Sequence, residues 1–232
     1  NLRFVRGSCN NLKILKEVFQ YNPGVVFHLA SRKGFNNTSV KNPINDLQTN
    51  TVSTLNLLKL SKDYNVKKFI YASSSCVYGN ILKKVNEKSK INLDTPYAIS
   101  KYTSEEYCKF FQKYHSLNIT IFRIFNTYGP GERIKKFSNV ICKFYENSYN
   151  NSPLKIMGDK YSSRSYLYVD DLIKAFYMAI KTSNFDNEIL NIGSEQNTTV
   201  FSLAKLIKQI SNSKSLIIKT PYRDWDVVVH RS

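Results

Sequence analysis

Short runs of β-branched and aromatic residues alternate with longer amphipathic helical patterns along most of this chain. One run, Val25–Leu29, is apolar without interruption and follows Pro23-Gly24, which is typical of a strand buried on both faces of a sheet. Strands that alternate with helices of this length indicate βαβ units and therefore an α/β fold with a parallel sheet. The expected strands are 2–5, 25–29, 68–72, 119–125 and 154–156, and the expected helices are 10–20, 43–64, 97–115, 136–147, 169–181 and 200–210.

Polar stretches follow three of the expected strands. These stretches are Ser31-Arg32-Lys33, Ser73-Ser74-Ser75 and Asn126-Thr127-Tyr128-Gly129. Right-handed crossovers bring the carboxyl ends of parallel strands to one edge of the sheet, where ligands bind in folds of this kind. The topology therefore predicts a ligand site formed by these stretches.

The charge balance is strongly basic, with 34 Lys and Arg against 17 Asp and Glu and a formal net charge of +17. Such an excess fits a nucleic acid, an anionic membrane surface or an anionic small substrate. The basic residues are scattered, however, in runs no longer than pairs such as Lys67-Lys68, and no basic–aromatic patch or nucleic-acid-binding motif is present. A coding bias toward AT-rich codons explains the joint abundance of Lys, Asn, Ile, Tyr and Ser. We favour that interpretation and expect no nucleic-acid partner.

Apolar runs and cysteines limit the class of protein further. No apolar stretch approaches the roughly 18–20 residues that span a bilayer, so no membrane partner is expected. Cys9, Cys76, Cys108 and Cys142 lie far apart, with no CxxC pair and no histidine at metal-ligand spacing. This pattern excludes a zinc ribbon or a disulfide framework, and we expect no metal site. A reducing compartment, the cytoplasm, is the expected location.

A tyrosine and a lysine with catalytic potential stand four residues apart at Tyr97 and Lys101, on one face of an expected helix. Tyrosine acts as a base only when its pKa, about 10, is lowered toward neutral pH, which a lysine charge and a cofactor cation together can do. The same spacing recurs in two pairs that we interpret as ordinary surface pairs, Tyr64…Lys68 and Tyr177…Lys181. What distinguishes Tyr97 is its context, because the polar run Ser73–Ser75 and a Thr95-Pro96 helix start precede it.

Several motifs in a fixed order extend this context over nearly the whole chain. They are Phe27-His28-Leu29-Ala30-Ser31, Ser73-Ser74-Ser75-Cys76-Val77-Tyr78-Gly79, Pro96-Tyr97-Ala98-Ile99-Ser100-Lys101, Arg123-Ile124-Phe125-Asn126-Thr127-Tyr128-Gly129-Pro130, Arg164-Ser165-Tyr166-Leu167-Tyr168-Val169-Asp170-Asp171 and Leu190-Asn191-Ile192-Gly193. With these motifs the sequence resembles the extended short-chain dehydrogenase/reductase family, and within it the nucleotide-sugar epimerases and dehydratases.

The resemblance implies catalytic roles for three residues. Tyr97 is the implied proton acceptor from a sugar hydroxyl, and Lys101 the residue that lowers its pKa and holds the nicotinamide ribose. Ser74 is implied to hydrogen-bond the reacting oxygen. The implied cofactor is NAD, and the implied cofactor-binding residues are Ala30, Ser31, Lys33, Asn50, Tyr97 and Lys101.

The resemblance also implies partners. The substrate is a nucleotide-diphosphate sugar, with implied contacts from Ser74, Asn126, Asn139, Arg164 and Arg223. Arginine suits the diphosphate because its planar guanidinium pairs with phosphate oxygens bidentately. A homodimer that pairs helices 43–64 and 97–115 with those of a second copy is also implied.

The implied fold has two parts. A Rossmann-like doubly wound parallel sheet, formed by 1–130 and 165–193, binds NAD, and a smaller α/β substrate-binding lobe is formed by 131–164 and 194–232. The sequence contains neither the family's GxxGxxG loop nor the acidic residue that holds the adenosine ribose. The resemblance therefore implies a fragment that lacks the N-terminal βαβ, about 50 residues, and part of the C-terminal lobe. We expect that fragment to be inactive alone.

The residues before the Val-Tyr-Gly turn narrow the implied reaction. Dehydratases of the family typically carry Asp-Glu there and sugar-acid decarboxylases keep the Glu, whereas this chain has Ser75 and Cys76. The favoured hypothesis is thus an NAD-dependent nucleotide-sugar 4-epimerase that works through a 4-keto intermediate with Tyr97 as acid/base. The alternatives are a 4,6-dehydratase or a sugar-acid decarboxylase of the same family. A non-catalytic NAD-binding relative is a further alternative, but it would be expected to lose Tyr97 or Lys101.

Overall fold

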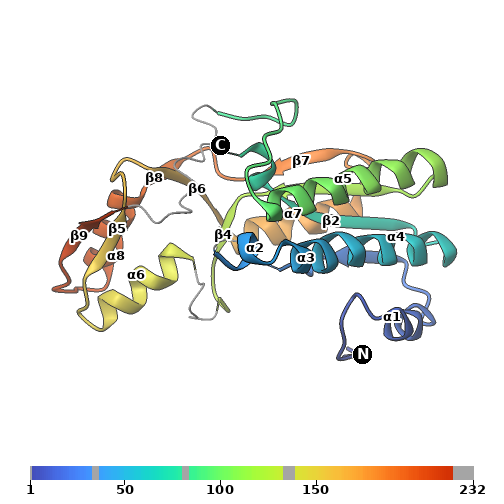
Figure 1. Ribbon diagram of the computed structural model, residues 1–232, viewed down its shortest axis with the longest axis horizontal. Helices are drawn as coiled ribbons and strands as arrows, with labels where there is room; N and C mark the ends of the chain where they lie inside the picture. The colour runs from blue at the N-terminus through green and yellow to red at the C-terminus, as the bar shows by residue number, and fades with distance from the viewer. Residues whose placement is uncertain (1, 33–36, 80–83, 133–138, 222–232) are drawn as a thin grey trace. The chain divides into compact units, whose positions relative to one another are not determined.

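The computed structural model describes residues 2–32, 37–79, 84–132 and 139–221 (Figure 1). The chain divides into two compact units. Unit 1 comprises residues 1–79, 91–124 and 174–191, and unit 2 comprises residues 80–90, 125–173 and 192–232. The sequence-based cofactor domain, 1–130 and 165–193, also includes residues 80–90, 125–130, 165–173 and 192–193, which belong to unit 2. That assignment concerns cofactor binding, which a division by compactness does not test, so it stays a prediction.

Unit 1 is built around a four-stranded sheet. The sheet has the order β1-β2-β3-β7, and β1, β2 and β3 pair in parallel. The elements from the N-terminus to the third strand are α1 (Leu12–Phe19), β1 (Val25–His28), α2 (Asn37–Lys41), α3 (Pro43–Asp46), the π-helical η1 (Leu47–Val52), α4 (Ser53–Asp63), β2 (Lys68–Ser74), the 3-10 helix η2 (Ser75–Tyr78), α5 (Pro96–His115) and β3 (Ile119–Ile124). Most of α7 (Val169–Lys181) and of β7 (Ile189–Ile192) also belongs to this unit.

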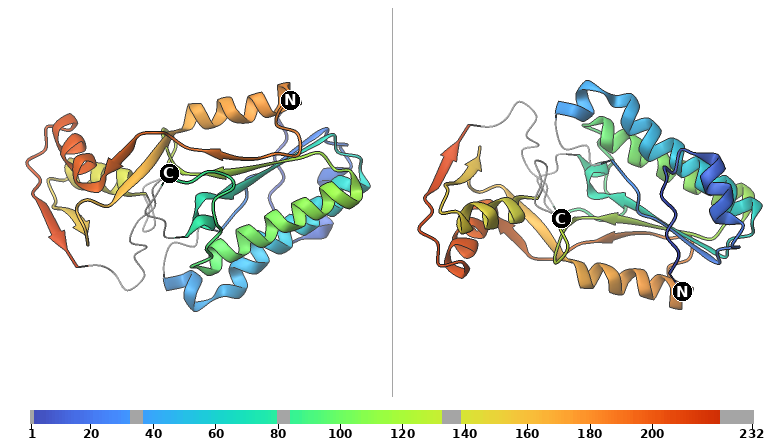
Figure 2. Two further views of the ribbon diagram at one scale, coloured as in Figure 1. Left: turned by 90° about the horizontal axis from the view of Figure 1, so that it is seen from above. Right: turned by 90° about the horizontal axis from the view of Figure 1, so that it is seen from below.

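Helices cover both faces of this sheet. Figure 2 shows α4 and α5 on one face and α7 on the other. On the α7 side, the ring of Phe176 packs against those of Phe27 and Phe122, with both ring centroids at 5.6 Å. All seven residues of β2 are buried, as a strand covered on both faces requires. The expected α/β fold with a parallel sheet is confirmed.

The core of unit 1 lies between the sheet and the α4–α5 layer. It gathers buried residues of α4, β2, α5 and β3, among them Leu58, Phe69, Cys108 and Ile119, none of which has exposed surface. This packing places α5 directly over β2 and β3. Lys101 and Glu105, one and two turns after Tyr97, therefore meet the carboxyl end of β2.

Local sequence determines where α5 begins and ends. The Thr95 hydroxyl accepts a hydrogen bond from the Ala98 N–H at 3.1 Å, and Pro96 occupies the first turn, where its missing N–H costs nothing. At the other end, Ser116 has a φ of 52° and leaves the helix in the left-handed conformation. These caps hold the first turn of α5, which carries Tyr97, at a defined position.

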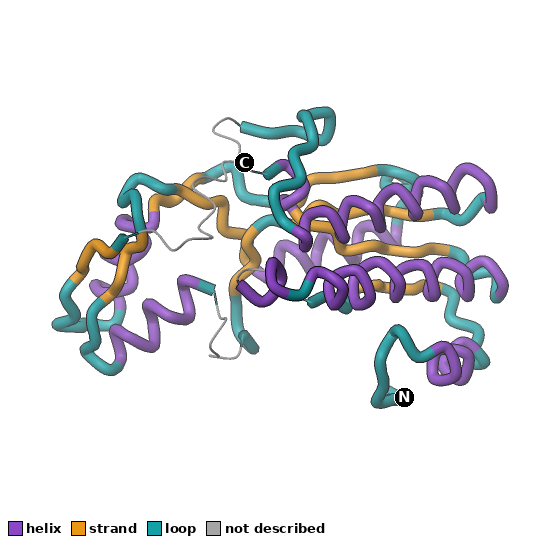
Figure 3. The backbone as a smooth tube through the Cα atoms, viewed as in Figure 1, coloured by secondary structure: helices purple, strands orange, loops and turns teal. Residues whose placement is uncertain are grey.

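Unit 2 contains smaller sheets and two helices. Its elements are β4 (Asn126–Tyr128), α6 (Val140–Tyr149), β5 (Leu154–Met157), β6 (Ser163–Tyr168), β8 (Asn197–Thr199), α8 (Val200–Ile210) and β9 (Ile217–Thr220) (Figure 3). One sheet has the order β4-β6-β8, and β5 pairs with β9 in parallel. Phe144, Leu154, Leu203 and Ala204 form a core of their own.

The structure corrects some expected elements. The expected strand 2–5 is wrong, because Leu2 and Phe4 are largely exposed and this segment pairs with no strand among the described residues. The expected helix 43–64 is divided into α3, η1 and α4, with the π-helical turn in its middle. The strands β4, β6, β7, β8 and β9 escaped the sequence analysis, since four of them have only three or four residues and β6, with six, mixes serine, arginine and tyrosine without a clear apolar face. Among the described residues, no helix combines the length and the apolar character that crossing a membrane requires.

Core packing on α4 can be tested by truncation. Leu58→Ala should lower the free energy of unfolding by about 2–5 kcal/mol, because it leaves a cavity under α4 that the close-packed sheet cannot fill. Ile180→Ala, at a position 41% exposed, should change it by less than about 0.5 kcal/mol. Urea unfolding followed by circular dichroism measures both. Equal losses in the two variants would contradict this description of the core.

Candidate active site at the carboxyl end of β2

Ser74 is the last residue of β2 and the N-cap of η2. Its hydroxyl accepts a hydrogen bond from the Cys76 N–H at 3.2 Å, so the chain turns immediately after the strand. Gly79 ends that turn with a φ of 63°, and a Cβ there would lie 2.5 Å from the backbone oxygen of Asn92. Only glycine fits this conformation and this contact. The turn therefore holds Ser74 at the carboxyl edge of the sheet.

Tyr97 lies in the first turn of α5, and its phenol is brought to Ser74. Tyr97 is 9% exposed, and burial raises its pKa to about 12, an effect that the neighbouring Cys76 and Asp46 increase. Hydrogen bonds with the side chains of Ser31 and Ser74 act in the opposite direction and lower the pKa. The structure thus brings three predicted site residues together, and the phenol is protonated at neutral pH.

Lys101 lies one helical turn after Tyr97 and is buried. Its Nζ donates a hydrogen bond to the Ala72 carbonyl oxygen at 2.7 Å and lies 5.0 Å from the centre of the Tyr71 ring. Burial lowers the pKa of Lys101 to about 8. An ammonium has three N–H donors, and among the described residues Ala72 is the only hydrogen-bond acceptor of Nζ. Two donors are therefore left for a ligand with hydroxyl groups.

The loop after β1 is held by Asn50, which is buried in the π-helical turn η1. Its Oδ1 accepts hydrogen bonds from the Ser31 hydroxyl at 3.1 Å and from the Arg32 N–H at 2.8 Å. Its Nδ2 donates to the Ser100 hydroxyl at 2.9 Å, and that hydroxyl donates to the Tyr97 carbonyl oxygen. Asn50 therefore ties the loop to the first turn of α5. Ala30 and Ser31 are exposed at the end of β1, and Lys33 lies outside the described residues.

Two residues of this site escaped the sequence analysis. Ser100 connects Asn50 to α5, and Asp46, fully buried, lies 3.7 Å from the Arg32 guanidinium and is hydrogen-bonded by Ser39. The sequence carries no local signal for Asp46, because the residues one and two turns further along, Asn50 and Ser53, are polar as well.

Apart from Ser74, the predicted substrate residues that the structure describes lie in unit 2. The amide of Asn126 donates to the Ser165 carbonyl oxygen at 3.2 Å, and that of Asn139 donates to the Thr127 carbonyl oxygen at 3.0 Å. Arg164 is on β6 and donates to the Ser163 carbonyl oxygen. These bonds connect each side chain to the backbone of its own unit. Arg223 lies outside the described residues.

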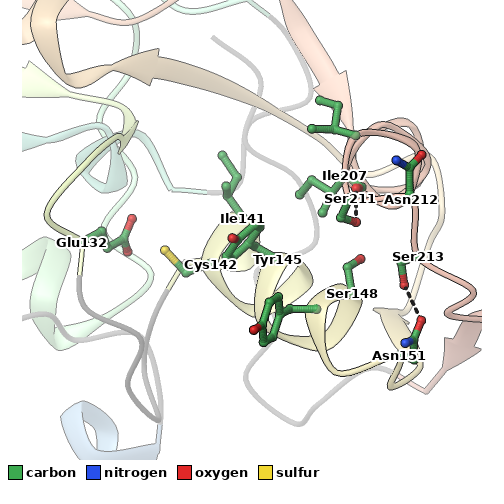
Figure 4. A pocket seen from close by; sticks show the side chains of 12 residues that line it. Glu132, Ile141, Cys142, Tyr145, Ser148, Asn151, Ile207, Ser211, Asn212 and Ser213 are labelled. Atoms are coloured by element: carbon green, nitrogen blue, oxygen red, sulfur yellow. Dashed lines mark hydrogen bonds between the residues drawn. The ribbon is translucent and has the colours of Figure 1, made fainter.

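Unit 2 also contains a groove of about 590 Å³ between α6 and α8 (Figure 4). Ile141, Tyr145 and Ser148 line it from α6, and Ile207 lines it from α8. None of the described candidate residues takes part in its lining, although Glu132, which does, accepts a hydrogen bond from the Asn139 N–H at 3.2 Å. Among the described residues, no group of three or more metal-ligating side chains is present.

Comparison with known proteins gives consistent matches. Residues 1–193 match the family model described as NAD dependent epimerase/dehydratase family. The solved UDP-glucose 4-epimerase of Thermotoga maritima, in complex with UDP-glucose, has 34% identity and a TM-score of 0.93, over 99% of this chain and 74% of that one. The UDP-glucuronic acid 4-epimerase of Bacillus cereus, with UDP-glucuronic acid and NAD, has 27% identity and a TM-score of 0.88, over 98% and 70%.

Relatives with other reactions match as well. The dTDP-D-glucose 4,6-dehydratase of Dictyostelium discoideum is 32% identical over 91% of this chain and 50% of its own length. A decarboxylase of UDP-N-acetyl-glucosaminuronate is also among the relatives. The chain spans between 50% and 66% of the length of the first curated relatives that it matches. The neighbouring structures confirm the Rossmann-like α/β fold that the motifs predicted.

The buried ammonium of Lys101 should make stability depend on pH. Its pKa of about 8 in the folded chain lies below the ordinary 10.5, so between these values the unfolded chain binds a proton that the folded chain does not. Stability then rises with pH in that window. Between pH 7 and pH 9 the free energy of unfolding should rise by about 1 kcal/mol relative to Lys101→Met.

Urea unfolding at each pH measures this difference. The matched control is Lys59→Met, which removes an exposed lysine from the same unit and should show no such change relative to the unmodified chain. Parallel pH curves for the unmodified chain and Lys101→Met would show that Lys101 does not titrate in this way.

Proposed function

Because the chain belongs to the NAD-dependent epimerase/dehydratase family, we propose that the protein inverts the C4 hydroxyl of a nucleotide-diphosphate sugar. The observation that carries the proposal is the meeting of Ser74, Tyr97 and Lys101 at the carboxyl end of β2, where the Ser74 side chain lies near enough to the Tyr97 phenol to lower its pKa. These residues provide a proton donor or acceptor, a partner for the reacting oxygen and a buried cation.

The chain's own residues fit a cofactor with ribose hydroxyls. Lys101 has two N–H donors without an acceptor among the described residues, in a buried position next to Tyr97. The exposed hydroxyl of Ser31 is oriented by Asn50 at the end of β1. We propose that Lys101 holds the nicotinamide ribose, that Ala30 and Ser31 contact the cofactor and that Asn50 keeps their loop in place. Lys33 stays a predicted contact. When bound, NAD supplies a hydride acceptor for C4 and a positive charge that lowers the pKa of Tyr97.

The proton steps follow from the site. The Tyr97 phenolate takes the proton of the C4 hydroxyl as the C4–H bond breaks with departure of hydride, which leaves a 4-keto sugar. The Ser74 hydroxyl donates a hydrogen bond to the same oxygen and stabilises the charge that develops on it. After the ketone presents its opposite face, hydride returns to C4 and Tyr97 returns the proton to the oxygen. The reaction is balanced and consumes no reductant.

Two residues of η2 support epimerisation over elimination of water. Ser75 and Cys76 are buried next to Ser74, and neither a hydroxyl nor a thiol acts as a carboxylic acid at neutral pH. Elimination from C5 and C6 needs an additional acid–base pair at this place. Dehydration and decarboxylation remain the alternative reactions, since relatives that carry them out match this chain too. Tyr97 and Lys101 are both present, which weighs against a non-catalytic relative.

We further propose that unit 2 binds the nucleotide diphosphate through Asn126, Asn139, Arg164 and Arg223. The net charge of +17 suits an anionic substrate. A guanidinium such as that of Arg164 pairs well with phosphate oxygens.

A homodimer is proposed from the outer face of α5. Tyr107, Phe110 and Tyr114 are exposed there at i, i+3 and i+7 spacing, and Ile44 and Leu47 are exposed on the neighbouring α3 and η1. Exposed apolar residues gathered in this way mark interaction surfaces. We propose that the surface formed by α5, α3 and η1 pairs with the same surface of a second copy.

Substitution of Tyr97 tests the reaction. A chain that contains these residues together with the family's GxxGxxG loop should interconvert UDP-glucose and its C4 epimer in the presence of NAD, as followed by proton NMR. Tyr97→Phe should lower kcat and kcat/KM together by about 10²–10⁴-fold, because the phenol acts mainly in the transition state. KM should change little.

Matched controls are Tyr64→Phe and Tyr177→Phe, which remove phenols outside the site and should leave kcat within a few-fold. Near-normal turnover by Tyr97→Phe would show that the catalytic assignment is wrong. Accumulation of a 4-keto-6-deoxy sugar, detected by mass spectrometry as loss of water, would show that the protein is a dehydratase.

The proposed dimer surface can be tested with charges. Phe110→Glu combined with Tyr114→Lys should turn a dimer into a monomer, because charged side chains would be desolvated in the interface. Light scattering coupled to size exclusion measures the mass. Leu216→Glu, at a position of unit 2 that is 68% exposed, serves as the control and should leave the dimer intact. A monomeric unmodified protein at high concentration would contradict the proposal.

A further inference from the structure

A buried ion pair lies directly behind the candidate active site. Glu105 of α5 and Arg123 of β3 are almost without exposed surface. The Arg123 Nη2 donates to Glu105 Oε2 at 2.7 Å, and its Nε lies 3.1 and 3.2 Å from the two carboxylate oxygens. The carboxylate raises the pKa of Arg123 above its ordinary value. The two side chains form an ion pair in the interior of unit 1.

The ion pair makes hydrogen bonds to both ends of one short segment. The Ser73 hydroxyl donates to the Glu105 carboxylate. The Arg123 Nη1 donates to the Tyr78 phenol oxygen at 2.9 Å, and the Arg123 guanidinium lies 5.0 Å from the centre of the Tyr78 ring. Tyr78 in turn donates to Asn191 Oδ1 at 2.7 Å. Every one of these residues belongs to unit 1.

Ser74 lies between these two anchored residues. Ser73 precedes it in β2, and Tyr78 closes the η2 helix that Ser74 caps. On the helix side, Glu105 stands one turn after Lys101, whose Nζ bonds the carbonyl oxygen of Ala72. Helix α5, which carries Tyr97, is thus bonded to β2 at Ala72 and at Ser73, the two residues before Ser74.

The energetics of a buried ion pair suggest what these contacts are for. Removing two charges from water costs several kcal/mol for each ion, and the attraction of the pair roughly offsets this cost. Apolar residues of similar size often give equal or greater stability. What apolar residues cannot provide is a set of directional hydrogen bonds to a serine and a tyrosine. Stability alone therefore does not explain Glu105 and Arg123.

We propose that Glu105 and Arg123 are positioning residues, which hold the Ser73–Tyr78 segment so that the Ser74 hydroxyl meets the Tyr97 phenol. The effect on catalysis rests on the proposed function. The effect on the Ser73–Tyr78 segment can be measured without reference to catalysis. Cys76 lies within this segment, and alkylation of the buried Cys76 thiol reports whether the segment opens.

The experiment compares Glu105→Leu, Arg123→Met and the double variant with the unmodified protein. Each single variant leaves a buried charge without its partner and should lower stability in urea unfolding. The double variant removes both charges and should regain most of that stability. Its Cys76 should nevertheless react with iodoacetamide about tenfold faster than in the unmodified protein, as expected when hydrogen bonds to a charged group are lost. Peptide mass spectrometry distinguishes Cys76 from Cys108, which is buried in α5 and reports global opening.

Turnover provides the second measurement. In the double variant kcat should fall about tenfold or more with little change in KM, since the lost alignment matters mainly in the transition state. The variant Glu105→Gln keeps an acceptor for Ser73 and should show a smaller rise in Cys76 alkylation. Lys68→Met is the matched control for lost stability, because it removes the ammonium that pairs with Asp186 at 2.5 Å and bonds the last carbonyl groups of α7.

Each outcome decides the proposal. If the double variant has the same rate of Cys76 alkylation and the same kcat as the unmodified protein, the proposal is overturned. The pair would then serve stability alone. If the double variant stays unstable, faster Cys76 alkylation than in Lys68→Met supports the proposal, and an equal rate overturns it. If a chain that also carries the GxxGxxG loop does not epimerise nucleotide sugars, the proposed function fails, while the Cys76 measurement still decides whether the pair positions the segment.

Discussion

The packing of α5 against the carboxyl end of β2 is the contact on which the rest of the site depends. Lys101 and Glu105 reach from one face of α5 to Ala72 and Ser73, and this holds the first turn of the helix beside the last residue of the strand. Because the strand is buried on both faces, neither partner can move without opening the core. The Tyr97 phenol and the Ser74 hydroxyl meet as a result of this packing.

Burial has opposite consequences for the two titratable groups of the site. It raises the pKa of Tyr97 to about 12 and lowers that of Lys101 to about 8, so at neutral pH the phenol is protonated while Lys101 is still mainly an ammonium. A phenol in this state is a proton donor and becomes a base only when positive charge arrives next to it. The proposed chemistry accordingly couples the base to the presence of a cationic cofactor, which would limit proton abstraction to the loaded site.

The two units contribute different kinds of residue. Unit 1 carries the groups that we propose to move protons, and unit 2 carries amides and a guanidinium of kinds that suit phosphate oxygens. The relatives that match nearly all of this chain differ in reaction, from epimerisation to dehydration, while they share the fold. In the proposed function, Ser75 and Cys76 of η2 are the residues that favour epimerisation over elimination of water.

The sequence by itself determined the α/β class, the long helices and the placement of polar residues at strand ends, because these depend on periodicity and on local caps such as Thr95. Motif order also indicated Tyr97, Lys101 and the family. Tertiary structure alone decided that Leu2–Val5 pairs with no strand among the described residues, that a π-helical turn places Asn50 against the loop after β1, and that Glu105 meets Arg123. Residues 18 positions apart in sequence carry no local signal of contact, since their pairing depends on how a helix packs over a sheet.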